Sequence, residues 1–173
     1  MAVLFLSHFR TYHDDADQNN ENAYAGEDVA IKFFSGQNII LRIQQYSTTS
    51  SGSQTMLLQY SKNGGAYTSV PTSAGGDLRI VASPFFSNGA SATQRLSSSA
   101  PSYNNGYAMS TANPTPTINT SVAFWECVWC LQFNPSAIGS YYTFKMLVGA
   151  TSPTLTVTPK ITIVPNNGFF TVI

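Results

Sequence analysis

The stretch Ser121–Phe133, SVAFWECVWCLQF, decides the predicted fold. Its apolar residues alternate with a period of two, and five of them share one face: Trp125, Cys127, Trp129, Leu131 and Phe133. The opposite face is also mostly apolar and consists of Phe124, Glu126, Val128, Cys130 and Gln132. Alternation of this kind is typical of a β-strand. Because both faces are largely apolar, we predict that this strand is central in a sheet and covered on both sides.

The rest of the chain consists of short β-branched and aromatic runs separated by turn-forming residues. Ser, Thr, Asn, Gly and Pro account for 73 of the 173 residues and interrupt every window that a helix would need. Nine runs are predicted to be strands: Val3–Thr11, Asp28–Phe34, Asn38–Gln45, Gln54–Ser61, Ala66–Val70, Leu78–Ala82, Ser121–Phe133, Tyr141–Val148 and Leu155–Val164. The pattern predicts an all-β fold, a single antiparallel β-sandwich of jelly-roll or immunoglobulin-like type with about eight or more strands. We expect this domain to span residues 1–164, followed by an apolar tail at 165–173.

Three local features refine the prediction. Asn63–Gly65, NGG, supplies the positive φ angles of a tight turn and predicts a hairpin. Pro159 shifts the alternation within Leu155–Val164 and indicates an edge strand or a bulge. The segment Ser97–Thr117 shows no periodicity, so we predict a long irregular loop there.

The charge balance excludes several classes of protein. Charged residues make up only 9% of the chain, and eight basic residues balance eight acidic ones. A nucleic-acid-binding protein would carry an excess of Lys and Arg. A disordered chain would lack the 11 Phe, 9 Tyr and 2 Trp found here. No run approaches the roughly 18 apolar residues of a membrane helix. We therefore expect neither a nucleic-acid partner nor a membrane.

The N-terminal residues MAVLFLSHFR contain no basic residue before their apolar run, so they do not match an export signal. We expect synthesis in a cytoplasm without cleavage. Cys127 and Cys130 form a CxxC motif, but residues three apart on a strand point to opposite faces, too far apart for a disulfide. We predict that both are buried structural thiols.

Six of the eight carboxylates fall within fifteen positions: Asp14, Asp15, Asp17, Glu21, Glu27 and Asp28. Asp15, Asp17 and Asn19 follow the first three ligand spacings of an EF-hand loop, but Asn20 and Gly26 break the motif. Two interpretations stay open: a calcium site of different geometry, and a solvated loop between the first two strands. The solvated loop is our prediction.

Catalytic signals are weak. His8 alternates with Leu4 and Leu6, which indicates a side chain facing the core. Glu126 is a lone acid on an apolar strand, and we predict that it pairs with Arg42 or Arg79 across the sheet. No nucleophile motif accompanies the serines. We predict no catalytic residue, no metal site, no cofactor and no enzymatic activity.

The segment Ser97–Thr117 contains Tyr103, Asn104, Asn105 and Tyr107, a mixture of rigid aromatic and adaptable polar residues that is typical of binding loops. It is a candidate site for a glycan or a protein partner. A flexible surface loop of similar composition is the alternative interpretation.

Two features favour assembly. A surface of Ser, Thr, Asn and Gln with almost no net charge suits a subunit that lies against its neighbours. The chain also closes with PNNGFFTVI, whose apolar residues either fold back beside the first strand or join a neighbouring molecule. The candidate assembly residues are Val3, Leu4, Phe5, Leu6, Phe169, Phe170, Val172 and Ile173.

Several short pieces of the chain, in order, carry a resemblance. They are His8–Arg10 with Asp14–Asp15, Gly26–Asp28, Leu41–Ile43, Leu58–Ser61 with Asn63–Gly65, Arg79–Ser83, Ala92–Leu96, Trp129–Gln132, and Thr156–Pro159 with Ile161–Ile163. Together they resemble a β-sandwich module of tailed-bacteriophage structural proteins and of large bacterial surface proteins. The likeness spans residues 7–163 and transfers no functional residue.

The resemblance implies work at the virion surface. A single module without a coiled-coil stem is similar to capsid decoration (cement) proteins, which bind the outer capsid surface and stabilise it. It implies the major capsid protein as partner and a homo-oligomer, for which a trimer is our expectation. The alternative is a tail or head-fibre adhesin that binds host glycan through residues 97–117.

Overall fold

Thirteen strands in two sheets make up the described part of the computed structural model, which covers residues 4–48, 52–97, 102–113, 117–119 and 122–166. They are β1 (Leu4–His13), β2 (Ile31–Phe34), β3 (Asn38–Ser47), β4 (Ser53–Lys62), β5 (Thr68–Ser69), β6 (Leu78–Ile80), β7 (Ala90–Ala92), β8 (Gly106–Met109), β9 (Thr117–Asn119), β10 (Phe124–Phe133), β11 (Tyr141–Val148), β12 (Thr154–Leu155) and β13 (Lys160–Val164). One 3₁₀ turn, Pro135–Ala137, is the only helical element among the described residues. No helix in these residues has the length and apolarity needed to cross a membrane.

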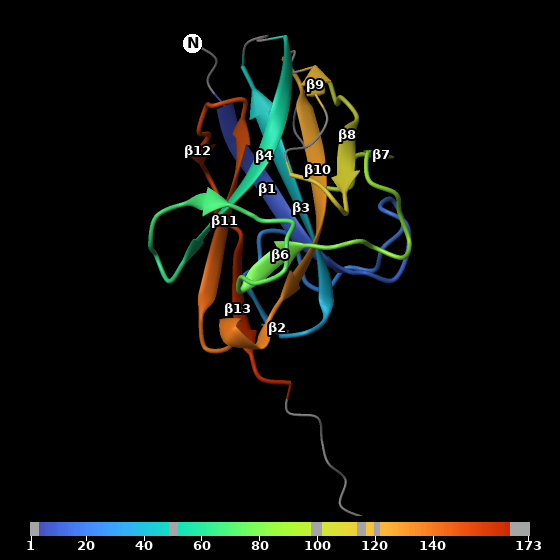
Figure 1. Cartoon of the computed structure of the whole chain (residues 1–173). Coiled ribbons are helices and arrows are strands. Elements are labelled where there is room, and N and C mark those ends of the chain that lie inside the picture. Colours follow the sequence, from blue (N-terminus) through green and yellow to red (C-terminus); the bar gives the residue numbers. More distant parts are fainter. Residues whose placement is uncertain (1–3, 49–51, 98–101, 114–116, 120–121, 167–173) are drawn as a thin grey trace, which may run out of the picture.

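The two sheets pack face to face as a sandwich, which confirms the predicted all-β fold. The first sheet has the order β12-β1-β3-β10-β8-β7, with β6 also paired to β10. The second has the order β2-β13-β11-β4-β5, with β9 also paired to β4. The long strands β1, β3, β4 and β10 cross the middle of the molecule (Figure 1). One correction concerns strand direction: the sheets are mixed, because β1–β12, β10–β8 and β13–β2 are parallel pairs.

The main core lies between the sheets and includes the predicted face of β10. Trp125, Cys127, Trp129, Leu131 and Phe133 all belong to it. They pack with inward residues of β3, such as Leu41, and of β11, such as Phe144. The alternation seen in the sequence therefore identifies the inner face of this strand correctly.

A second, smaller core covers the outer face of the first sheet. Val128 and Cys130 of β10 lie there beside Ile40 of β3 and Phe86, a residue of the segment between β6 and β7. Nine of the ten residues of β10 are consequently buried. The prediction of a central strand covered on both sides is confirmed.

The hairpin at Asn63–Gly65 is also confirmed. Asn63 and Gly64 have φ angles of 50° and 78°, and β4 pairs antiparallel with β5 beyond the turn. Positive φ at both central positions matches the right-handed twist of the paired strands.

Two predicted elements need correction. Leu155–Val164 is two strands in different sheets, because β12 pairs with β1 whereas β13 pairs with β11 and β2. Pro159 lies between them and has no N–H to donate, but its carbonyl accepts a hydrogen bond from the backbone N–H of Phe144 on β11. The segment Ser97–Thr117 contains β8 and the first residue of β9 rather than one irregular loop. A glycine makes this strand fit, because a Cβ at Gly106 would lie 1.5 Å from the backbone oxygen of Glu126.

Candidate functional site

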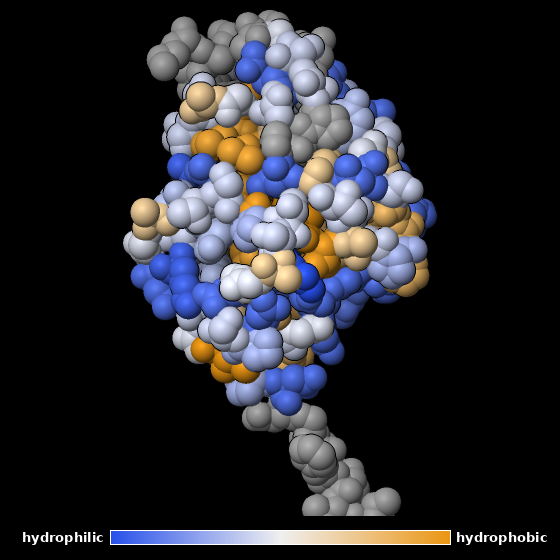
Figure 2. Space-filling model, in the orientation of Figure 1, coloured by the Kyte–Doolittle hydropathy of each residue, from blue (hydrophilic) through white to orange (hydrophobic). Residues whose placement is uncertain are grey.

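Charged side chains are largely withdrawn from the surface. All sixteen lie in the described part of the chain, and five of them are exposed: Asp15, Asp17, Lys32, Lys62 and Lys160. More than half of the exposed described residues are Ser, Thr, Asn, Gln or Gly. On the face drawn in Figure 2, hydrophobic residues form small separate patches within a pale, weakly hydrophilic surface. The surface is therefore polar but poor in ions.

A buried ion pair links the two central strands of the first sheet. Nη1 of Arg42 on β3 lies 2.8 Å from Oε2 of Glu126 on β10, and both side chains are fully buried. The Glu126 carboxylate also accepts backbone N–H bonds from Arg95 and Leu96. The prediction that Glu126 pairs with a cation across the sheet is confirmed for Arg42. Arg79 instead donates to Gln132.

A second buried acid extends this cluster. Glu21 lies 2.6 Å from Nη1 of Arg95 and 3.8 Å from Nη2 of Arg42. Burial raises the pKa of the Glu21 carboxyl, and the positive charge of Arg42 opposes that rise. The ring of Tyr12 lies beneath the Arg95 guanidinium at 4.7 Å. The cluster balances two acids with two arginines and ties residues 18–21 and 93–96 to the sheet, which is a structural role.

The predicted solvated acidic loop is therefore only partly correct. Asp15 and Asp17 are exposed, but both are hydrogen-bonded within the loop. The Asp15 carboxylate accepts from Asn22. The Asp17 carboxylate accepts from Asn19 and Asn20. The pKa of each is lowered by these bonds. Glu21 differs because it lies inside the ionic cluster just described. The six carboxylates of residues 14–28 thus belong to several separate hydrogen-bond networks and do not surround one site.

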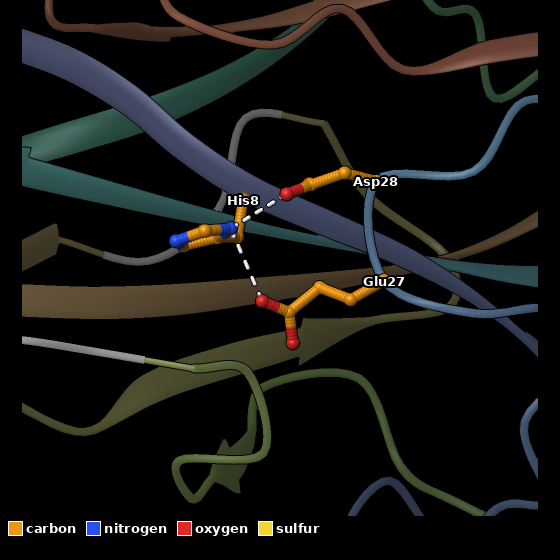
Figure 3. Close-up of side chains that lie close together, drawn as sticks. All are labelled: His8, Glu27 and Asp28. Atoms are coloured by element: carbon orange, nitrogen blue, oxygen red, sulfur yellow. Dashed lines mark hydrogen bonds and ion pairs between the residues drawn. The ribbon is translucent and has the colours of Figure 1, made fainter.

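Two of these acids converge on a histidine. Nδ1 of His8 lies 2.7 Å from Oδ2 of Asp28 and 3.1 Å from Oε1 of Glu27. Figure 3 shows the His8 ring, which projects from β1, with Nδ1 between the two carboxylates of the segment that precedes β2. All three side chains are partly buried, with 34%, 27% and 21% exposed for His8, Asp28 and Glu27. We call this group the His8 cluster.

The prediction that His8 faces the core is wrong, and a β-bulge is the reason. Leu6 pairs with Gln45, but His8 pairs with Gln44, so the register shifts by one residue between them. Leu6 and Phe9 both enter the main core as a result. A bulge redirects the side chains that follow it, and it turns His8 toward Glu27 and Asp28. The unequal spacing of Leu6 and Phe9 is the only sequence signal for this site.

The predicted ligand residues are built into the sandwich. The hydroxyl of Tyr103 donates to the carbonyl of Ala92, and burial raises the pKa of this hydroxyl. Tyr107 lies on β8 and packs against the main core, while the backbone N–H of Asn104 donates to the carbonyl of Phe124. Asn105 is the exposed member of the set.

A cleft of about 290 Å³ lies near this segment. Ser110 and Thr111 line it from one side, and Thr72, Arg79 and residues 80–82 complete its lining. Its polar residues offer hydroxyl groups and one guanidinium to a small polar ligand. None of the predicted ligand residues lines it.

The predicted assembly residues divide into three groups. Val3, Phe169, Phe170, Val172 and Ile173 lie outside the described residues. Leu6 is a fully buried core residue, and Phe5 is half-buried, while Leu4 begins β1. One prediction was that the C-terminal tail folds back beside the first strand. At Phe5 and Leu6 that edge of β1 is already paired with β12.

Both cysteines are buried free thiols, as predicted. Burial raises the pKa of Cys127 to about 12, and it also raises the pKa of Cys130. Neither is therefore a nucleophile at neutral pH.

Comparisons with protein-family models, with curated proteins and with solved structures found no match to this chain.

Proposed function

We propose that this chain is a non-enzymatic structural protein of a tailed-bacteriophage virion. It binds the outer capsid surface as a decoration protein, contacts the major capsid protein and stabilises the shell. The sandwich fold agrees with the module that the sequence resembles. The distribution of charge carries the proposal.

The internal use of charge favours a molecule that lies against a large protein surface. Placing an ion in an interface is costly unless it is paired, and the centres of interfaces are depleted of charged residues. Here the charges of Arg42 and Arg95 balance those of Glu21 and Glu126 within the fold. The exposed Ser, Thr, Asn and Gln can form hydrogen bonds with a neighbour without desolvating full charges.

Exposed apolar residues supply candidate anchors for this contact. Val29, Phe34, Phe85, Val122 and Ile138 are each 38–47% exposed. Val29 precedes β2 and Phe34 ends it, and β2 is the edge strand of the second sheet, paired with β13 alone among the described strands. We infer that the β2 edge, with Val29 and Phe34, faces the capsid and that Phe85 lies outside this contact. A trimer multiplies the weak contact by avidity.

Reconstitution tests the proposal. Particles lacking the chain are incubated with the purified full chain, recovered by gradient sedimentation and heated until they release DNA. We expect saturable binding and a higher release temperature than for particles without added chain. Particles that neither retain the chain nor gain heat resistance would contradict the proposal.

The alternative is a tail or head-fibre adhesin that binds host glycan through residues 97–117. The cleft beside Arg79 favours it, because Ser110 and Thr111 of that segment line the cleft. Glycan-array binding that is lost in Arg79→Ala and Thr111→Ala would support this function. A decoration protein would bind no glycan on the array.

A further inference from the structure

The His8 cluster has donor groups from two segments of the chain. His8 lies on β1, and Glu27 and Asp28 lie in the segment before β2. One ligand atom from each, Nδ1 of His8 and one oxygen of each carboxylate, lies within 4.8 Å of both others. Figure 3 shows one oxygen of each carboxylate directed at Nδ1 of His8. The set is one imidazole nitrogen and two carboxylate oxygens.

Each carboxylate is held by its other oxygen. The backbone N–H of Phe9 donates to Oδ1 of Asp28 at 2.8 Å, which leaves Oδ2 directed at His8. The backbone N–H of Ser97 donates to Oε2 of Glu27 at 3.0 Å, which leaves Oε1 directed at His8. Hydrogen bonds of this kind orient metal-ligating carboxylates.

The backbone at Asp28 is fixed as well. Its φ is 60°, a left-handed conformation that is uncommon outside glycine. The Asp28 N–H donates to the carbonyl of Phe9, so Phe9 and Asp28 bind each other through two hydrogen bonds. The position of the Asp28 carboxylate is therefore set by the fold.

The geometry points to a binding site for a first-row divalent transition-metal ion, with Zn²⁺ as the expected ion, held by His8, Glu27 and Asp28. Zinc takes nitrogen and carboxylate ligands at about 2.0–2.2 Å in a tetrahedron, which places ligand atoms about 3.3 Å apart. The observed separations of 2.7 and 3.1 Å between Nδ1 and the two oxygens need to widen only slightly to hold the ion, and the two carboxylate oxygens lie within 4.8 Å of each other. Two carboxylates balance the charge of the ion, and a water molecule completes its coordination.

The donor set also selects against the hard cations. Imidazole nitrogen suits zinc and its neighbours, whereas Mg²⁺ and Ca²⁺ prefer oxygen ligands in larger number. The side chains are about one-fifth to one-third exposed, so an ion has access from solvent. The sequence analysis predicted no metal site. The inference differs because only the structure brings His8 together with Glu27 and Asp28.

Isothermal titration of the full chain with ZnCl₂, after treatment with EDTA, tests the inference. We expect one Zn²⁺ per chain, with no comparable binding of CaCl₂ or MgCl₂. Substitution by Co²⁺ should give visible absorption bands of a bound ion.

Matched variants locate the site. His8→Ala and Asp28→Asn should each abolish the stoichiometric signal. Asn tolerates the left-handed backbone, and its amide oxygen can still accept from Phe9, so Asp28→Asn preserves the fold. His13→Ala removes the other histidine, which is exposed, and Asp15→Asn removes an exposed carboxylate; both should bind Zn²⁺ like the parent chain.

Two results would overturn the inference. One is the absence of Zn²⁺ binding in a chain whose circular dichroism shows it folded, which would leave only an imidazole hydrogen-bonded to two carboxylates. The other is Zn²⁺ binding that persists in both His8→Ala and Asp28→Asn. Neither result bears on binding to capsids, which is measured separately.

Discussion

The guanidinium of Arg42 and the carboxylate of Glu126 face each other 2.8 Å apart, and neither side chain is accessible to solvent. They lie on the outer face of β3 and β10, beneath the segments that carry Glu21 and Arg95. Removing one member of such a pair leaves an uncompensated buried charge, whereas removing both does not.

Substitutions at this pair should not be additive: the double variant should lose less stability than the sum of the losses in the two single variants. We expect Arg42→Met and Glu126→Gln each to lower the free energy of unfolding by about 3–5 kcal/mol. The double variant should recover a coupling energy of about 1–3 kcal/mol. Urea unfolding of the four proteins in the cycle measures these values.

The exposed pair Lys62–Asp77, 2.6 Å apart, is the matched control. Its coupling energy should fall below about 1 kcal/mol. Equal coupling energies in the two cycles would contradict a special role for the buried pair.

Gly106→Ala should disrupt the packing of β8 on β10. The new Cβ would meet the Glu126 backbone at 1.5 Å from the oxygen and 2.6 Å from the carbon, so the strands must separate. We expect a loss of about 3 kcal/mol or more in the free energy of unfolding. Gly76→Ala is the control, because its nearest atom is 3.8 Å away. Similar stabilities for the two variants would show that β8 does not pack this closely.

The periodicity of the sequence was sufficient to predict β10 and both of its faces, because burial on alternate residues leaves a direct trace in residue type. A lone acid on an apolar strand also predicted a cation partner for Glu126, Arg42 or Arg79, and the structure shows Arg42. The absence of periodicity in Ser97–Thr117 did not predict β8, because a strand of four residues leaves too short an alternation to recognise. The bulge before His8 and the approach of Asp28 depend on tertiary pairing, so neither could be predicted from local pattern.

The thiols of Cys127 and Cys130 should be unreactive in the folded protein. Burial raises the pKa of Cys127 to about 12, so its thiolate is scarce at neutral pH. Ellman's reagent should detect no thiol in the native chain and both thiols in urea. Rapid reaction of either cysteine under native conditions would contradict the burial described here.

Stability at acid pH should depend in part on Asp77. The hydrogen bond from Lys62 lowers the pKa of the Asp77 carboxyl below its ordinary value of 3.8. The folded state therefore releases this proton more readily than the unfolded state, and the stabilisation is present above the unfolded pKa and lost as pH falls through the folded pKa.

Asp77→Asn should flatten that part of the stability curve. The effect should stay below about 1 kcal/mol, since the pair is solvent-exposed. Urea unfolding at a series of acid pH values measures it, and a curve that is as steep in the variant as in the parent chain would exclude this contribution.

A charge placed on the β2 edge should weaken capsid binding. Phe34→Lys introduces a cation at an exposed position of this strand, and Phe85→Lys does the same in the segment between β6 and β7. We expect only Phe34→Lys to reduce co-sedimentation with particles, because a buried unpaired charge is costly at an interface. If both variants lose co-sedimentation equally, or if neither variant loses it, the contact does not lie at the β2 edge.

The copy number of the chain in purified virions is the most direct test of the proposed role at the capsid surface. Quantitative mass spectrometry of gradient-purified particles provides this number. We predict a fixed ratio to the major capsid protein, unchanged in heads that lack tails. Absence from the particles, or a copy number that follows the tail proteins and disappears from tailless heads, would contradict a decoration protein.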